Sequence, residues 1–282
     1  MAYKKILTIQ DFSCVGKCSL TVALPIISAF GIETSALPTA LLSTHTQFEN
    51  WTFLNLCDQI SPITTAWKKE NIKFDGIYTG YLGGVDLIET TKGIIHNFTK
   101  DDGIVMIDPA MGDNGKLYTG FDMDYAKASK TLCALADVIT PNVTEAAFML
   151  GMEYKPEYDY DYLLTLCKEL RDNGACDVVI TGVKKGENQV GAFCLLSNGK
   201  VFEYFNEREV KDFHGTGDIF SSSVYGALVN GKTLPEAVKF ACDFVKHCIA
   251  VTLENPNHSF YAVDFEKCIG DITDFVNNKT ER

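Results

Sequence analysis

Short apolar runs alternate along the chain with longer segments in which apolar residues recur every three or four positions. The short runs have the length of buried strands and predict them at 6–9, 76–79, 104–107, 138–140 and 178–181. The longer segments predict helices near 18–30, 58–71, 86–99, 122–135, 143–151 and 159–173. Strands that alternate with helices in this way favour an α/β fold, in which helices cover both faces of a mostly parallel sheet.

The pattern changes after residue 187. Residues 190–196 and 200–205 alternate between apolar and polar around Asn198-Gly199, which is typical of a β-hairpin. A helix is expected directly after Gly215, a second after the capping box from Thr233 to Glu236, and a last one near 264–277. Because no linker, repeat or low-complexity segment interrupts the chain, we expect one domain spanning 1–282.

Polar residues follow several of the expected strands. They are Gln10-Asp11, Gly80-Tyr81, Asp108-Pro109, Asn142 and Gly182. Ligands of parallel sheets bind beyond the carboxyl ends of the strands, so we expect a functional site at this edge of the sheet.

The segment Gly215-Thr216-Gly217-Asp218 precedes a run of small residues and carries the strongest chemical signal. Two glycines allow a tight turn with exposed amides, and the N-terminus of the following helix attracts anions. An acid beside such an anion site could act as a general base, which indicates phosphoryl transfer. The alternative is that Asp218 is only the N-cap of the helix.

Two further segments carry acids at strand ends. Asp108 and Asp113 lie on a loop stiffened by Pro109 and could hold Mg²⁺, a monovalent cation or a metal-bound water, or could be ordinary loop and turn acids. In the segment from Thr140 to Glu145, Asn142 and Glu145 have the spacing of a capping box, and they could instead complete a metal-water shell.

Other motifs are incomplete. Gly16-Lys17-Cys18-Ser19 lacks the first glycine of a P-loop and has Cys18 in place of the magnesium-binding hydroxyl. The first strand is not followed by the glycine pattern of a dinucleotide-binding fold. His45 has no paired Asp or Cys nearby in the sequence, so we do not expect it to bind a metal; contact with a substrate is left open.

Composition narrows the class of protein. The net charge of −12 disfavours nucleic acid and anionic membranes as partners. The ten cysteines are scattered without zinc spacing, which indicates a reducing compartment. The N-terminus shows no signal peptide and no apolar run could span a membrane, so we expect a cytoplasmic protein.

Taken together, these segments resemble the ribokinase superfamily and, within it, the pyridoxal kinases. The resemblance covers nearly the whole chain, and its motifs occur in order. They are Ile9-Gln10, 42–47 with His45-Thr46, Thr79-Gly80-Tyr81-Leu82-Gly83, 108–113, 140–145 and Gly215-Thr216-Gly217-Asp218. The last motif belongs to the whole superfamily, and the His-Thr and Gly-Tyr-Leu segments narrow the resemblance to kinases of vitamin B6. The resemblance implies a three-layer α/β/α sandwich and a homodimer.

The resemblance also implies a reaction. ATP would phosphorylate the 5′-hydroxymethyl group of a B6 vitamer (pyridoxal, pyridoxamine or pyridoxine) in the salvage of pyridoxal 5′-phosphate. Asp218 would be the general base, and the amides of Gly215, Thr216 and Gly217 would stabilise the transferred group.

Binding residues are implied in the same way. Asp11, Cys18, Thr46 and Tyr81 would surround the pyridine ring, with Tyr118 on a covering loop. Asp108, Thr140 and Thr181 would lie near a monovalent cation such as K⁺. Asp113 and Glu145 would place Mg²⁺ and the phosphates, and Thr181, Gly182 and Gly217 would line the ATP site.

The chain departs from the family pattern twice. Asp11 replaces a serine that binds the substrate ring, and Ser19-Leu20 replaces a Gly-Asn pair. We therefore expect Asp11 to favour a cationic vitamer, pyridoxamine. A hydroxymethylpyrimidine kinase is the alternative enzyme, although Asp218 stands where those enzymes usually carry cysteine. A non-catalytic B6-binding protein is the alternative from another class.

Overall fold

The computed structural model describes residues 3–211 and 213–278. A nine-stranded sheet runs through it in the order β11-β10-β9-β8-β5-β4-β1-β2-β3. The strands are β1 (Lys5–Val15), β2 (Glu33–Thr44), β3 (Phe53–Asn55), β4 (Phe74–Thr79), β5 (Thr99–Ile107), β8 (Val138–Ile139), β9 (Asp177–Lys185), β10 (Gln189–Leu195) and β11 (Val201–Glu207). From β9 through β2 the strands are parallel, whereas β3, β10 and β11 pair antiparallel. A small hairpin, β6 (Gly112–Asp113) and β7 (Lys116–Leu117), stands apart.

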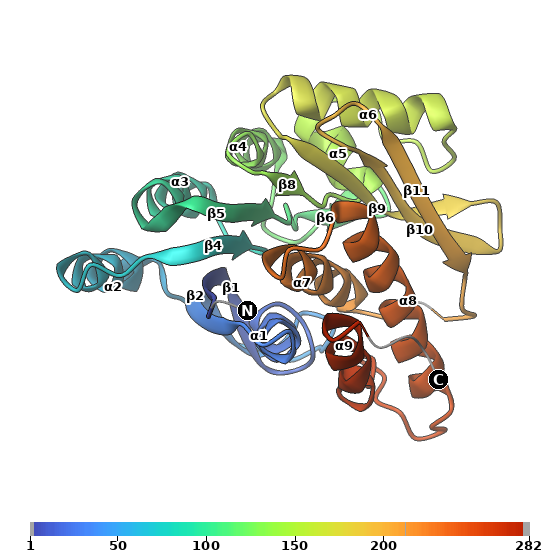
Figure 1. The fold of residues 1–282 in the computed structure, drawn as a ribbon, viewed down its shortest axis with the longest axis horizontal. Helices are drawn as coiled ribbons and strands as arrows, with labels where there is room; N and C mark the ends of the chain where they lie inside the picture. Colours follow the sequence, from blue (N-terminus) through green and yellow to red (C-terminus); the bar gives the residue numbers. More distant parts are fainter. Residues whose placement is uncertain (1–2, 212, 279–282) are drawn as a thin grey trace.

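Helices cover both faces of the sheet, as Figure 1 shows. They are α1 (Leu20–Ala29), α2 (Cys57–Lys69), α3 (Val85–Phe98), α4 (Met123–Cys133), α5 (Val143–Leu150), α6 (Tyr160–Asp172), α7 (Thr216–Val229), α8 (Leu234–Leu253) and α9 (Ile269–Val276), with a 3₁₀ turn at Phe265–Cys268. Among the described residues, no helix has the length and apolar character needed to cross a membrane.

The two faces bury separate apolar clusters. Because side chains alternate along a strand, Ile77 of β4 packs toward α2–α6, whereas its neighbour Tyr78 packs toward α1, α7, α8 and α9. A strand with both faces covered reads as a continuous apolar run, which is why the sequence showed these strands clearly. The α/β class and the mostly parallel sheet are confirmed.

The sequence missed β2 and misplaced the end of β1. Polar residues and Pro38 hide β2, which tolerates the proline because β3 pairs only with Ala40–Leu42, beyond it. Gln10 does not end the first strand, since β1 continues to Val15 past a register shift between Gln10 and Phe12. A bulge of this kind redirects side chains locally, and it lies where Asp11 enters the candidate site.

Candidate functional site

The tight turn before α7 is built on Gly215. Its φ is 80°, a left-handed conformation, and a Cβ atom there would lie 2.1 Å from the carbonyl oxygen of Lys17. Only glycine fits such a position. Gly215 is the N-cap of α7, so the alternative that Asp218 is the N-cap is wrong; Asp218 lies inside the first helical turn.

The carboxyl group of Asp218 has a pKa well above its usual range. Burial raises the pKa of its carboxyl, the backbone amide of Ser19 lowers it, and the charge of Asp11 raises it again, to about 7 in total. A general base works best when its pKa lies near the working pH. The carboxylate also faces the N-terminal turn of α7, where free backbone N–H groups favour negative charge.

A second acid, Asp108, follows β5 and faces Asp218. The pKa of its carboxyl is raised to about 8, mainly by burial and then by the charge of Asp218. A hydrogen bond with Ser221 of α7 acts in the opposite direction and lowers this pKa. The Ser221 hydroxyl lies 3.1 Å from the Thr140 hydroxyl. Strands β5 and β8 are thereby linked to α7 through buried hydroxyls and one carboxylate.

Glu145 holds the loop after β5. Its carboxylate accepts hydrogen bonds from the backbone of Met111 at 3.0 Å, Gly112 at 3.5 Å and Asn142 at 2.9 Å. Asn142 and Glu145 form the expected capping box of α5. Burial and then the charge of Asp108 raise the pKa of Glu145 well above its usual range, against these backbone bonds.

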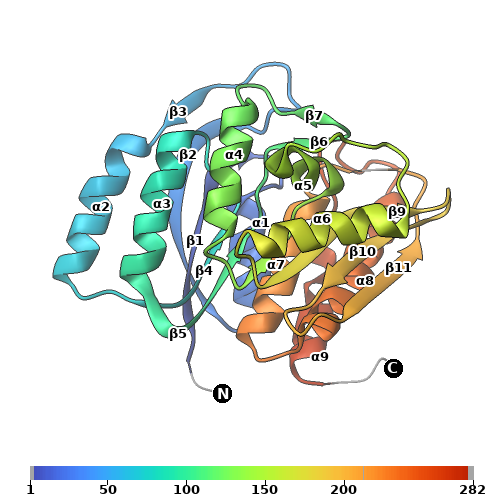
Figure 2. The same ribbon diagram turned by 90° about the horizontal axis from the view of Figure 1, so that it is seen from above.

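Asp113 lies elsewhere. It begins the turn between β6 and β7, where Asn114 and Gly115 both have positive φ, the conformation of a tight two-residue hairpin. Its exposed carboxylate accepts from the Asn114 backbone at 2.7 Å and side chain at 2.9 Å. The hairpin lies beside α5 (Figure 2), and Asp113 is exposed there, whereas Asp108 and Glu145 are buried.

Most of the expected ring-binding residues come together. Asp11 is 5 % exposed and accepts a hydrogen bond from Ser13 at 3.3 Å. After burial, the charges of Asp218 and Asp11 raise the pKa of the Cys18 thiol, and the charge of Asp11 raises that of Tyr81. The side chains of Cys18 and Tyr81 therefore lie within the electrostatic influence of the acids Asp11 and Asp218. The Tyr81 ring lies 5.1 Å from that of Phe121.

Thr46 and His45 lie directly after β2. Thr46 is exposed in the turn after β2. His45 is buried; its Nδ1 accepts from the Gln47 amide at 3.2 Å, so its Nε2 carries the proton and donates to the Tyr261 carbonyl at 3.1 Å. Both ring nitrogens of His45 are therefore hydrogen-bonded to backbone groups.

Tyr118 follows β7, and Thr181 and Gly182 lie within β9. Partial burial and then the charges of Glu145 and Asp113 raise the pKa of Tyr118, whose side chain is 43 % exposed on the loop after β7. The Thr181 amide donates to the Pro141 carbonyl at 2.9 Å, which joins the middle of β9 to the segment that follows β8. Gly182 has φ 64° at a register shift of β9 and lies open to solvent.

The inner acids Asp11, Asp108, Glu145 and Asp218 have no basic partner: the ion pairs found among residues 3–211 and 213–278 leave all four out. Within the same residues, no three acid, histidine or cysteine side chains gather into a metal-binding group. The donors are all oxygens, which suits a hard cation. Mg²⁺ in nucleotide enzymes usually binds one or two carboxylates together with phosphates, so this donor set fits a cation that arrives with its nucleotide.

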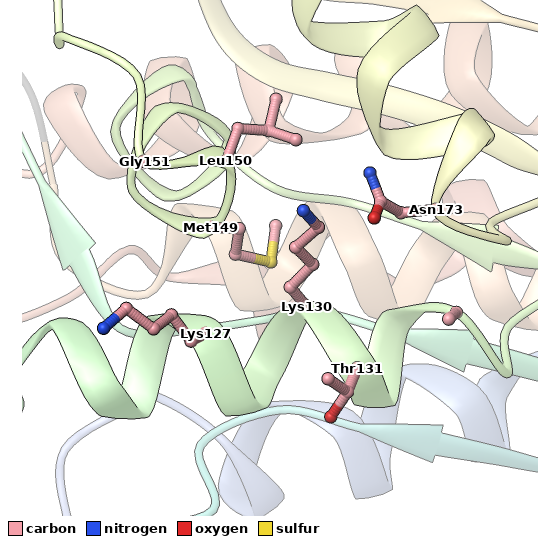
Figure 3. Close-up of a pocket in the computed structure, with 8 residues that line it drawn as sticks. Lys127, Lys130, Thr131, Met149, Leu150, Gly151 and Asn173 are labelled. Carbon is pink, nitrogen blue, oxygen red and sulfur yellow. The ribbon is translucent and has the colours of Figure 1, made fainter.

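A surface hollow of about 520 Å³ lies away from these acids. Lys127 and Lys130 of α4, Met149 of α5 and Asn173 after α6 line it (Figure 3). None of the four acids lines this hollow, so the candidate site is identified by the chemistry of its residues.

Sequence reasoning missed Ser19 and Ser221. Ser221 belongs to a run of small residues in the sequence. A serine three positions after Asp218 lies on the same helix face, and a buried hydroxyl needs a partner. That spacing was the available signal. For Ser19, no sequence signal reveals the contact with Asp218, because it depends on how α1 packs against α7.

Comparison with known proteins shows what the chain is similar to. Residues 57–264 match the family model described as phosphomethylpyrimidine kinase. A provisionally named phosphomethylpyrimidine kinase from Bacteroides thetaiotaomicron, crystallised with pyridoxal, is 35 % identical with a TM-score of 0.92, over 96 % of each chain. The pyridoxal kinase of Lactobacillus plantarum is 30 % identical with a TM-score of 0.90, over 99 % of each chain. The pyridoxine kinase of Bacillus subtilis is 34 % identical over 68 % of this chain and 72 % of its own.

Proposed function

The chain belongs to the phosphomethylpyrimidine kinase family of the ribokinase superfamily and is a phosphotransferase, and we propose that it transfers the γ-phosphoryl group of ATP to the 5′-hydroxymethyl group of vitamin B6 vitamers. The observation that carries this proposal is the pairing of Asp218, in the anion-attracting first turn of α7, with a neighbouring group of Asp11, Cys18 and Tyr81 that suits a polar aromatic ring. The pyridoxal in the Bacteroides relative supports the same substrate class.

Asp218 starts the reaction in this proposal. Its carboxylate takes the proton of the substrate hydroxyl, the oxygen bonds to the γ-phosphorus, and the bond from that phosphorus to the ADP oxygen breaks. The backbone amides of Gly215, Thr216 and Gly217 stabilise charge on the transferred group. Positioning and electrostatics suffice here, because phosphoryl transfer asks for little covalent help from the protein.

The proposed reaction also requires bound cations. Asp108 and Glu145 would hold Mg²⁺ together with the nucleotide phosphates, and Asp108, Thr140 and Thr181 would lie near a monovalent cation such as K⁺. Burial first and mutual repulsion second raise the pKa values of Asp108 and Glu145, and a cation bound near Asp108 would counteract both while it neutralises phosphate charge. Asp113 would reach the phosphates only if its bonds to Asn114 opened.

The decisive experiment compares kcat/KM for ATP-dependent phosphorylation of pyridoxal, pyridoxamine, pyridoxine and hydroxymethylpyrimidine. We expect the three vitamers to be phosphorylated at least about 100-fold more efficiently than the pyrimidine, because a pocket built to pair with a substrate's polar groups rejects an analogue that leaves them unpaired. Preference for the pyrimidine would instead place the enzyme in thiamine synthesis. Vitamer binding without turnover would support a binding protein.

A further inference from the structure

The segment Gly16-Lys17-Cys18-Ser19, which we call the 16–19 loop, does not use its lysine to bind phosphate. The Lys17 ammonium points to the segment before α9 instead. It donates to the Val263 carbonyl at 3.0 Å, to Glu266 at 2.8 Å and to Asp264 at 3.4 Å. The lysine side chain is only 21 % exposed, and Asp264 is 17 % exposed. This contact joins parts of the chain 246 residues apart.

The opposite side of the 16–19 loop lies against the anion turn. The Lys17 carbonyl oxygen is the atom that a Cβ at Gly215 would meet at 2.1 Å. A Cβ at Gly16 would lie 2.2 Å from the His45 ring, which itself binds the Tyr261 carbonyl. The loop is therefore enclosed between His45, Gly215 and the segment 261–266, and it has little room to move.

Thr21, in the first turn of α1, fixes the backbone of the 16–19 loop. Its hydroxyl donates to the Cys18 carbonyl at 2.7 Å, with the Gly16 carbonyl at 3.1 Å, and accepts from the Cys18 amide at 3.2 Å. The next residue, Ser19, adopts φ 48° and ψ −126°, a conformation that residues with a side chain rarely take. Strain of this kind persists only where the surroundings enforce it, and it is common at functional sites.

Ser19 is the point at which this loop meets the acids. Its backbone amide faces the Asp218 carboxylate, and its hydroxyl faces Asp11. Ser19 is also the N-cap of α1, and its own carbonyl accepts from Val22 at 3.0 Å and Ala23 at 2.9 Å. A shift of the loop would therefore move the amide that stabilises Asp218 and the hydroxyl that stabilises Asp11 together.

We propose that the 16–19 loop is a positioning element for the reaction, and that Lys17, through its ion pairs with Asp264 and Glu266, is the residue that holds it against Gly215. The inference rests on the proposed function. Neither Lys17 nor Ser19 touches the reacting atoms in this account; both act through the placement of Asp218 and Asp11. The segment 261–266 thereby becomes part of the support of the site, although it lies nearly 50 residues beyond Asp218.

The loop's role can be tested with a matched pair of variants. Lys17→Met removes the ion pairs and keeps most of the apolar stem. Lys267→Met is the control, because Lys267 bonds the other oxygen of Asp264 at 2.8 Å and does not touch the loop. We expect Lys17→Met to lower kcat about tenfold or more while KM for ATP stays within about twofold, since small misplacements of a catalytic group are costly. Lys17→Arg should restore most of kcat, and Lys267→Met should match the wild type.

Amide hydrogen exchange separates failure of this inference from failure of the proposed function. Residues 16–21 should exchange about tenfold faster in Lys17→Met and at the wild-type rate in Lys267→Met, whichever substrate the enzyme uses. Equal exchange and equal kcat in wild type and Lys17→Met would overturn the positioning role while leaving the vitamer kinase intact. A wild type inactive on vitamers, with faster exchange only in Lys17→Met, would overturn the proposed substrate and retain the loop's support by Lys17.

Discussion

Gly215 and Lys17 approach each other so closely that the glycine has no room for a side chain, with 2.1 Å between a Cβ at Gly215 and the Lys17 carbonyl oxygen. The contact joins the anion turn of α7 to the loop that precedes α1, and both carry groups that face Asp218. Two segments about 200 residues apart in the sequence are thus in direct backbone contact beside Asp218.

Gly215→Ala should therefore unfold the turn or displace the loop. We expect a loss of more than about 2 kcal/mol in unfolding free energy, because a left-handed φ and a backbone clash act together. Gly217→Ala is the matched control for stability, since a Cβ there meets nothing within 4 Å. Denaturant unfolding of both variants measures the difference, and equal stabilities would contradict the contact.

The pH dependence of activity should report Asp218. With a pKa of about 7, its carboxyl becomes a base only as the pH rises through neutrality. We expect kcat/KM for the vitamer, at saturating ATP and Mg²⁺, to rise about tenfold per pH unit below 7 and to level off above it. A rate that stays flat between pH 5.5 and 7.5 would exclude Asp218 as the base in this form.

Asp218→Asn should separate catalysis from stability. We expect kcat to fall roughly 10²- to 10⁴-fold while the vitamer still binds. The folded-state pKa of Asp218 lies above the usual 3.8, so the folded protein favours the protonated acid and loses stability as the pH rises from about 4 through about 7. The variant should thus unfold at a higher temperature than the wild type at pH 8, and the difference should shrink toward pH 5. A lower melting temperature at pH 8 would contradict the burial of an uncompensated charge.

Glu145→Gln tests the anchor of the loop after β5. Its amide nitrogen would face the Asn142 N–H, so that two donors meet in a buried place. We expect a loss of roughly 1–3 kcal/mol in unfolding free energy. The control is Glu236→Gln in the exposed capping box of α8, which should cost less than about 1 kcal/mol. Equal losses would mean that Glu145 acts only as a helix cap.

Asp11→Ser tests the preference among vitamers. A buried carboxylate near a pyridoxamine ammonium would attract it, whereas a phenolate would be repelled. We expect the ratio of kcat/KM for pyridoxamine to that for pyridoxal to fall at least about fivefold in the variant, with kcat for pyridoxal retained. An unchanged ratio would remove Asp11 from ring recognition and leave it as a partner of Ser13 and Ser19.

The sequence alone predicted the buried parallel strands other than β2, the helices between them and the tight turn before α7. A strand buried on both faces has an apolar run, a capping box has a fixed residue spacing, and a tight turn has glycines. Each of these features is therefore encoded within a few neighbouring residues. The strand containing Pro38 escaped because its pairing, and not its composition, makes it a strand.

Only the tertiary structure decided which acids meet. Asp108 and Asp113 are five residues apart, yet one lies inside the protein near Asp218 and the other bonds Asn114 at the surface, because Asp113 already belongs to the β6–β7 hairpin. The segment around Lys17 is an incomplete phosphate-loop motif in the sequence, and only the structure shows that Lys17 pairs with Glu266. Contacts between residues far apart in the chain depend on how whole elements pack, and no local pattern records that packing.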